Sequence, residues 1–139
     1  MMLRRGFIAI LVLTLAACGK QGNVVPNVTV NFQLQLGNPQ YSQLRSVGNA
    51  ILIDNKGVAG VVVANTVYGY TAYDRCSAYE PEKRCAVTID AGALTVTDPC
   101  SGSKWLLQDG TPVKAPAVRS LKAYNVYIDP SRNYLTISN

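Results

Sequence analysis

The stretch VTVNFQLQL, from Val28 to Leu36, alternates apolar and polar residues without interruption. Because successive side chains of a strand point to opposite faces, this pattern predicts a strand with one buried face and one face in water. It is the clearest strand signal in the chain. Toward the C-terminus, short runs of β-branched and aromatic residues recur and extend the same interpretation.

Eight further runs rich in β-branched or aromatic residues are predicted as strands. They span residues 50–53, 60–64, 68–73, 86–90, 94–97, 105–107, 122–128 and 134–138. Turn-forming residues lie between them, at 54–57, 90–92, 109–110 and 129–133. No segment keeps helical periodicity for ten residues, although residues 39–44 fit a short turn of helix. The sequence therefore predicts an all-β fold class, either a sandwich or a small barrel.

The chain has 139 residues, of which 48% are hydrophobic and none is histidine. This length supports one domain with its own core. The absence of His excludes a Ser-His-Asp or Cys-His nucleophile pair, a His general base and every His-ligated metal site. The carboxylates lie mostly in predicted turns, where Asp caps its own backbone. Because nothing indicates a facing pair for acid–base catalysis, we expect that the protein is not an enzyme.

The N-terminal residues have the layout of a targeting segment. Arg4 and Arg5 precede an uncharged apolar run from Phe7 to Ala17. As a helix this run would be roughly 16 Å long, whereas a bilayer core is about 30 Å thick. Residues 1–17 are therefore predicted to be a secretory signal peptide. The four residues LAAC, which end at Cys18, resemble a bacterial lipobox, in which lipid is attached to the Cys thiol and the chain is cut just before it.

The lipobox resemblance implies a mature lipoprotein that begins at Cys18 and is held to a membrane by acyl chains. Residues 18–27 would form a lipidated leash of mostly small and polar residues, and residues 28–139 would form the domain. We expect the protein in the bacterial cell envelope. Gly19 follows the lipidated Cys where an acidic residue would favour the inner membrane, so by resemblance to known sorting patterns we expect the outer membrane. A nucleic-acid partner is not expected, whereas the mild basic excess would favour phosphate-rich membrane surfaces.

Two cysteine-containing segments follow predicted strands: DRCSAYEPEKRC at 74–85 and DPCSGSKW at 98–105. The motifs DG at 109–110, APA at 115–117 and LKAY at 121–124 come after them. This order resembles the Rieske iron–sulfur domain, in which a C-x-H loop precedes a C-P-C-H-G-S-x-aromatic loop, a Gly-containing turn, a G-P-A loop and an L-x-x-Y strand. The resemblance covers roughly residues 57–138. It implies a Rieske-like antiparallel β-sandwich or small barrel with a two-loop tip.

The resemblance places Cys76 and Ala78 at the first pair of cluster-ligand positions, and Asp98 and Ser101 at the second pair. A Rieske centre takes two thiolates on one iron and two imidazoles on the other. Three of the four positions therefore lack the ligand that the family uses, and they are interpreted as vestigial. Cys18 does not complete a set of four Cys ligands, because it is expected to be acylated and distant. We expect no cofactor and no metal ion.

For two other cysteines, Cys85 and Cys100, the resemblance implies a disulfide and not a ligand role. In high-potential Rieske domains an additional Cys in each loop forms a disulfide between the loops, and Cys85 and Cys100 fall on those places. The resemblance implies a Cys85–Cys100 disulfide, which an exported compartment permits. The sequence itself leaves Cys76–Cys100 and Cys76–Cys85 open as alternatives. If Cys85 pairs with Cys100, Cys76 is an odd thiol, which the neighbouring Arg75 would activate or which burial would leave inert.

The function predicted from these observations is that of a membrane-anchored lipoprotein with a binding or structural role. The loop tip, defined as residues 74–85, 98–105 and 115–117, faces the redox partner in working Rieske proteins, so we expect an unidentified protein partner there. Tyr79 is a candidate contact residue, with packing on the core as the alternative. Two other functions stay open. One is a two-iron two-sulfur electron-transfer protein with atypical ligation by Cys76 and Asp98, and the other is a thiol redox protein that uses Cys76, Cys85 and Cys100.

Overall fold

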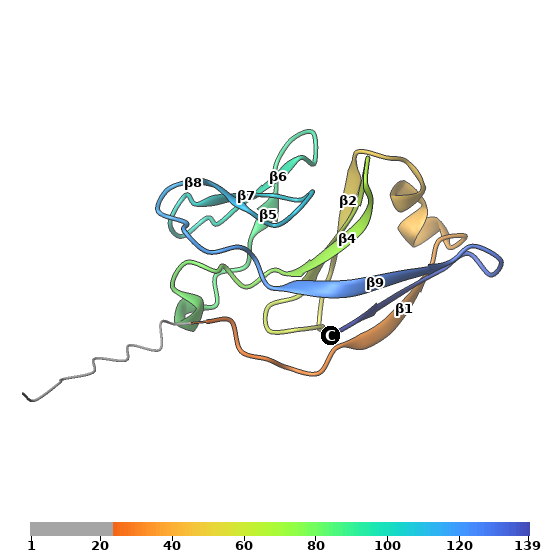
Figure 1. Cartoon of the computed structure of the whole chain (residues 1–139), viewed down its shortest axis with the longest axis horizontal. Coiled ribbons are helices and arrows are strands. Elements are labelled where there is room, and N and C mark those ends of the chain that lie inside the picture. Colours follow the sequence, from red (N-terminus) through yellow and green to blue (C-terminus); the bar gives the residue numbers. More distant parts are fainter. Residues whose placement is uncertain (1–23) are drawn as a thin grey trace, which may run out of the picture.

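The computed structural model describes residues 24–139. The predicted signal peptide, Cys18 and the first part of the leash lie outside the described residues. Within residues 24–139, no helix has the length and hydropathy needed to cross a membrane. The described chain forms two antiparallel sheets and two short 3-10 helices (Figure 1), which confirms the prediction of an all-β fold.

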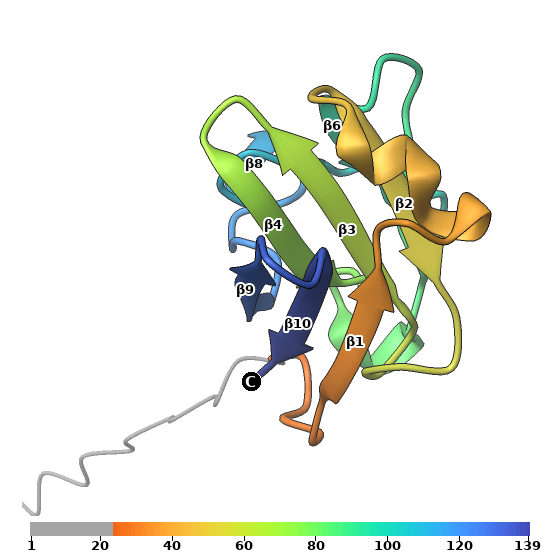
Figure 2. The same cartoon turned by 90° about the vertical axis from the view of Figure 1, so that its right-hand side faces the viewer.

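The larger sheet has six strands in the order β1-β10-β9-β4-β3-β2. In that order the strands span Asn31–Gln35, Tyr134–Ser138, Ala123–Asp129, Gly69–Asp74, Val61–Thr66 and Asn49–Ile53. Every neighbouring pair is antiparallel. The sheet curls into a half-barrel, with β1 and β10 turned away from the plane of β3 and β4 (Figure 2).

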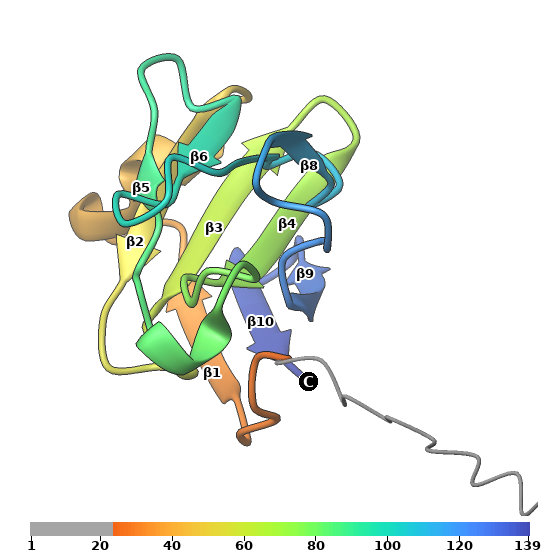
Figure 3. The same ribbon diagram turned by 90° about the vertical axis from the view of Figure 1, so that its left-hand side faces the viewer.

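The smaller sheet has four strands in sequence order, β5 (Thr88–Ile89), β6 (Thr95–Thr97), β7 (Lys104–Leu106) and β8 (Pro112–Lys114). Figure 3 shows this sheet lying over β3 and β4. The 3-10 helix η1 (Pro39–Arg45) lies between β1 and β2 in the chain, where a short helical turn is predicted. The second 3-10 helix, η2 (Pro81–Lys83), lies in the loop between β4 and β5.

The alternation of apolar and polar residues from Val28 to Leu36 is confirmed by the burial of β1 and its flanks. Val30, Leu34 and Leu36 are buried, while Asn31, Gln33 and Gln35 are exposed. The strand itself covers only Asn31–Gln35, because β10 pairs with those five residues. The buried side chains pack into the core inside the half-barrel.

Strand β3 is buried on both faces and separates two hydrophobic cores. Val61 and Val63 belong to the core of the half-barrel, together with Leu135 and Ile137. The alternate residues Val62 and Ala64 belong to a second core that includes Val87, Val96, Trp105 and Leu121. The smaller sheet is thus held to the larger one by apolar packing, and the loops that connect the two sheets start from this packed centre.

The structure differs from the sequence prediction at three places. Strand β8 (Pro112–Lys114) is not expected from the sequence, because it begins with Pro and has no alternating pattern. The strand predicted over residues 86–90 is reduced to Thr88–Ile89, because only these two residues pair with β6. Tyr68 is predicted at the start of a strand but lies in the turn before β4, where 79% of it is exposed.

Candidate functional site

The first of the two loops runs from β4 to β5 and is closed at its base by main-chain hydrogen bonds. Cys76 and Ala86 form an isolated antiparallel bridge, and the Ser77 amide donates to the Cys85 carbonyl over 2.8 Å. The segment between them contains η2 and carries a Glu80–Lys83 ion pair at the surface. The hydrogen bond from Lys83 lowers the pKa of Glu80, which keeps that pair charged at neutral pH.

The second loop connects β6 to β7 and is a tight turn. The Asp98 amide donates to the Ser103 carbonyl, and the Gly102 amide donates to the Asp98 carbonyl, each over 2.8 Å. Gly102 has a φ of 79°, a conformation that favours glycine. This backbone conformation explains why glycine occupies position 102 in the Gly-Ser pair of the second loop.

A disulfide joins the two loops. It links Cys85 to Cys100, whose Cα atoms lie 6.3 Å apart, and Cys76 is the free cysteine among the described residues. This is the pairing that the resemblance implies, and the two alternatives that involve Cys76 are not formed. By loop-closure entropy, a crosslink between residues 15 positions apart stabilises a fold by about 3 kcal/mol.

The carboxylate of Asp98 lies beneath this disulfide and is 1% exposed. Its Oδ2 accepts hydrogen bonds from the hydroxyls of Ser77 and Ser101, each over 2.7 Å. Its Oδ1 accepts from the Cys100 amide over 2.8 Å. Ser77 comes from the first loop, so Asp98 connects the two loops a second time, through hydrogen bonds in addition to the disulfide.

A second buried carboxylate lies at the base of the first loop. Asp74 is fully buried, and its oxygens accept from the amides of Val58, Ala59 and Cys76 over 2.6, 3.2 and 2.8 Å. The Tyr124 hydroxyl also donates to Asp74 over 2.7 Å. Burial and this bond to Asp74 raise the pKa of Tyr124, so the phenol stays protonated and remains a donor. Sequence reasoning misses this network, although the repeated D-x-C spacing of the two loops is a signal for it.

The thiol of Cys76 is buried next to Asp74. Its Sγ lies 3.5 Å from the Pro81 carbonyl oxygen, and the residue is not exposed to solvent. Burial, followed by the negative charge of Asp74, raises the pKa of Cys76 to about 11. Arg75 is bound elsewhere, because its guanidinium donates to the Val87 carbonyl and to Asp54. Of the two interpretations of the odd thiol, the inert one fits this environment.

The loop tip encloses a polar cleft of about 270 Å³. Its lining includes the disulfide, Asp98 and Ser101, with Pro116 of the APA motif on the opposite side. Tyr79 and the Glu80–Lys83 pair complete the lining. Tyr79 also packs against the second core, which is the alternative considered for this ring.

The four predicted ligand positions do not all lie around this cleft. Asp98 and Ser101 both line it. Cys76 is buried and does not line it, and Ala78 lies instead on a neighbouring cavity of about 220 Å³ beside Val24 and Arg119. Ala78 also packs its methyl group against the second core.

These residues do not fit a Rieske cluster. A Rieske cluster takes two thiolates and two imidazoles. The four ligand positions here offer a thiol, a methyl group, a carboxylate and a hydroxyl, from Cys76, Ala78, Asp98 and Ser101. One group of three metal-ligand types lies close together in residues 24–139, namely Cys85, Asp98 and Cys100, whose ligand atoms lie within 4.8 Å of one another. Both sulfurs of that group are in the disulfide, and a metal ion binds thiolates.

Comparisons with known proteins place the fold. No protein-family model matches the sequence, and a search of curated proteins finds no significant match. Among solved structures, the cyanobacterial plasma membrane Rieske protein of Synechocystis PCC 6803 aligns with a TM-score of 0.53 and 20% identity, over 70% of this chain and 93% of that chain.

Two ferredoxins are also similar. The Sphingomonas yanoikuyae B1 ferredoxin aligns at 16% identity and a TM-score of 0.49, over 70% of this chain and 93% of its own. The ferredoxin of carbazole 1,9a-dioxygenase from Nocardioides aromaticivorans IC177 aligns at 19% identity and a TM-score of 0.48, over 68% and 90%. The alignment with the Synechocystis Rieske protein shows that the chain has a Rieske-like fold, as the order of its loop motifs implies.

Proposed function

We propose that the protein is a bacterial cell-envelope lipoprotein that uses its Rieske-like domain for binding or for a structural role, without an iron–sulfur cluster. It would be tethered by lipid on Cys18, with the outer membrane as the expected location, and it would catalyse no reaction. The loop tip would be the binding surface, through the cleft lined by the disulfide, Asp98 and Tyr79.

The state of Asp98 carries this proposal. A carboxylate that ligates iron directs a lone pair at the metal, but three of the four lone pairs of Asp98 are taken by two hydroxyls and one amide. No buried side-chain polar atom among the described residues lacks a hydrogen-bond partner. The interactions that a cluster would supply between the loops are thus supplied by the disulfide and by the Asp98 network.

The polar character of the cleft favours binding over catalysis. Its charged rim is an ion pair of Glu80 with Lys83, whose charges balance. The thiol of Cys76 is buried and does not line the cleft, and its pKa is raised to about 11. Such a rim suits a polar docking contact, in which charges give specificity more than affinity.

Iron analysis of the purified mature protein tests the central statement. We expect substoichiometric iron and acid-labile sulfide, no visible absorption beyond the protein bands, and no paramagnetic signal after reduction. A coloured protein with two iron atoms and two sulfides per chain would contradict the proposal and favour the electron-transfer alternative with atypical ligation.

The thiol redox alternative is tested by labelling. Because burial raises the pKa of Cys76 to about 11, thiolate is scarce at neutral pH, and we expect the native lipidated protein to react slowly with a thiol reagent. In denaturant without reductant, one thiol per chain should be labelled. Rapid labelling of the native protein at pH 7, or exchange with a small dithiol that Cys76→Ser abolishes, would favour the redox alternative.

The lipid anchor is tested by mass analysis of the mature N-terminus. We expect a chain that starts at Cys18, carries acyl chains and sediments with membranes. A Cys18→Ser variant should be released into the soluble fraction with an unchanged fold, because the domain does not include residue 18. A wild-type protein that stays soluble and unmodified would contradict the anchor.

A further inference from the structure

The segment PVKAPAVRSLK, residues 112–122, contains three basic residues and no acidic residue. We call this segment the basic flank. It exposes apolar side chains as well, because Val113 is 51% exposed and Val118 is 83% exposed. Cations interspersed with exposed apolar groups are typical of surfaces that contact anionic lipid headgroups.

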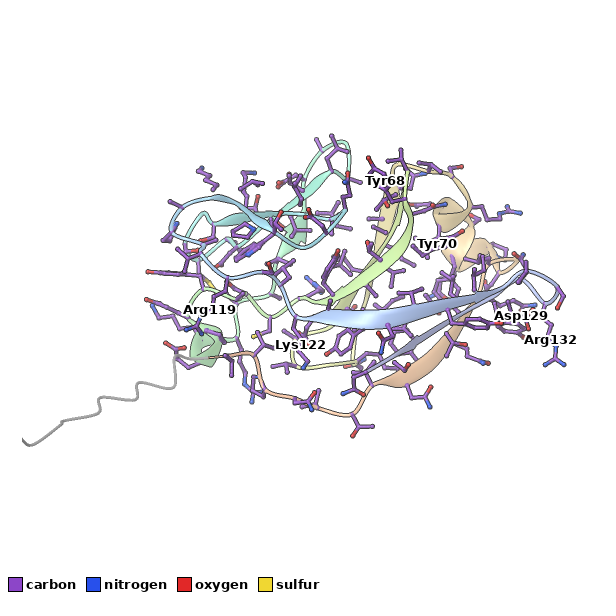
Figure 4. The ribbon with its side chains drawn as sticks, in the orientation of Figure 1. Tyr68, Tyr70, Arg119, Lys122, Asp129 and Arg132 are labelled. Carbon is purple, nitrogen blue, oxygen red and sulfur yellow. A yellow bond between two sulfur atoms is a disulfide. The ribbon has the colours of Figure 1, made fainter. Side chains whose placement is uncertain are left out.

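The first residues that the structure describes, Val24 and Val25, lie next to the basic flank. Val24 and Val25 line the same cavity as Arg119, Ser120 and Lys122. The Lys122 ammonium also donates to the Asn27 side-chain carbonyl over 2.9 Å. In Figure 4, Arg119 and Lys122 lie toward the side from which the chain begins, while Asp129 and Arg132 lie at the opposite end of the long axis.

The distance to the anchor is limited by chain geometry. Val24 is six residues beyond Cys18, and six residues span at most about 20 Å even when fully extended. A domain of this size has a radius of gyration of roughly 13 Å and is about 35 Å across. If the opposite end of the domain faced the bilayer, the leash would need to span about the full width of the domain. It is too short to do so.

The basic flank is held in a fixed orientation on this side. The Trp105 indole donates to the Arg119 carbonyl over 2.8 Å, and the Leu121 amide donates to the Gly110 carbonyl over 3.0 Å. Trp105 is fully buried and Leu121 nearly so, both in the second core. The cations and the exposed Val118 are thus presented by a rigid segment and require no rearrangement to meet a surface.

We propose that the basic flank lies against the anionic lipid surface in which Cys18 is anchored. This inference rests on the lipid anchor of the proposed function. Lipid headgroups supply the negative charge that Lys114, Arg119 and Lys122 would contact, and the interface supplies an apolar layer for Val118. Pro116 belongs both to the flank and to the lining of the cleft, so the cleft would open close to the membrane.

Two matched valines allow a direct test. Val118 lies in the flank and Val67 in the turn between β3 and β4, and they are 83% and 75% exposed. The variants Val118→Cys and Val67→Cys would each be made in the lipidated full chain, labelled with a fluorophore under non-reducing conditions and incorporated into vesicles that contain phosphatidylglycerol. A quencher attached to the lipid headgroups then reports how close each label is to the surface.

We expect several-fold stronger quenching at position 118 than at position 67. The difference should decrease at high salt, which screens exposed charges. It should also decrease in Lys114→Gln but not in Arg132→Gln, a control at an exposed arginine of the opposite end. Equal quenching at both positions in protein that sediments with the vesicles would overturn this inference alone. Failure to sediment at all would overturn the lipid anchor, and with it the inference.

Discussion

Two buried carboxylates lie at equivalent places in the two loops. Asp74 and Asp98 each stand two residues before a cysteine, and each accepts the amide hydrogen of that cysteine over 2.8 Å. Both are essentially excluded from solvent. Their remaining partners differ: those of Asp74 are backbone amides of residues 58 and 59 and the Tyr124 hydroxyl, and those of Asp98 are serine hydroxyls.

Because their partners differ, the two carboxylates stabilise different parts of the structure. Two donors to Asp74 are backbone amides in the segment between β2 and β3, and a third is the hydroxyl of Tyr124 on β9. The larger sheet fixes their positions, so they cannot reach other acceptors when the carboxylate is lost. The hydroxyls of Ser77 and Ser101 can rotate. Ser101 lines the cleft, where water is within reach, and the buried Ser77 hydroxyl has a second acceptor in the Tyr79 carbonyl oxygen at 3.0 Å. Asp74 therefore fastens the first loop to the domain, whereas Asp98 fastens the two loops to each other.

The largest expected effect is that of Asp74→Ala. It leaves several buried donors without an acceptor, and we expect a loss of about 3–5 kcal/mol in the free energy of unfolding, measured by denaturant titration. Asp109→Ala is the matched control, because Asp109 accepts the amide of Thr111 in a similar turn at the exposed surface. A loss below about 1 kcal/mol in Asp74→Ala, comparable with an exposed site, would remove the distinction drawn here.

Removal of the disulfide is expected to come next. The double variant Cys85→Ala/Cys100→Ala should lose about 3 kcal/mol, since it frees the two loops in the unfolded state. Amide exchange in β1 and β10 should keep its pattern, because these strands are paired away from the loops. An unchanged unfolding midpoint would mean that the Asp98 network alone holds the tip.

Asp98→Ala should cost less than Asp74→Ala, about 1–3 kcal/mol, because its hydroxyl donors have other acceptors: water for Ser101 and the Tyr79 carbonyl oxygen for Ser77. Its effect should be coupled to that of the disulfide. In a double-mutant cycle with Cys85→Ala/Cys100→Ala, we expect an interaction free energy of at least about 0.5 kcal/mol. Additive effects would indicate that the two connections between the loops act independently.

Single hydroxyl deletions give the smallest effects and compare the two networks directly. Tyr124→Phe removes one donor from Asp74, and Ser77→Ala removes one donor from Asp98. Each should cost about 1 kcal/mol, with the larger loss in Tyr124→Phe, because Asp74 is fully buried and does not line the cleft, whereas Asp98 does. Thermal unfolding of the two variants under identical conditions measures the order, and a reversed order would contradict the comparison.

The fold follows from the sequence to a large extent, because its signals are local. The alternation from Val28 to Leu36 identifies the buried face of β1, and short β-branched runs identify most other strands. Strand β8 lacks such a pattern, since only its pairing with β7 makes Pro112–Lys114 extended. The Cys85–Cys100 pairing follows from the family resemblance, because spacing alone allows three pairings.

The network of Asp74 could not be predicted, because its donors are scattered over 67 positions of the chain, from Val58 to Tyr124. Local patterns place aspartate in exposed turns, and the repeated D-x-C spacing marks Asp74 and Asp98 as equivalent without showing which donors reach the end of β4. The resemblance assigns Asp98 and Ser101 to one loop, but it does not indicate that they line a cleft while the methyl group of Ala78 packs against the second core.

The pairing of β1 with β10 has a consequence for biosynthesis. Asn31 faces Ser138, so the first strand of the half-barrel acquires its only neighbour in the sheet from the last strand. A nascent chain that has not yet released residues 134–138 from the ribosome cannot close this core. Because chain entropy is lost before such non-local contacts form, this topology slows closure of the core, and β1 stays unpaired until residues 134–138 become available.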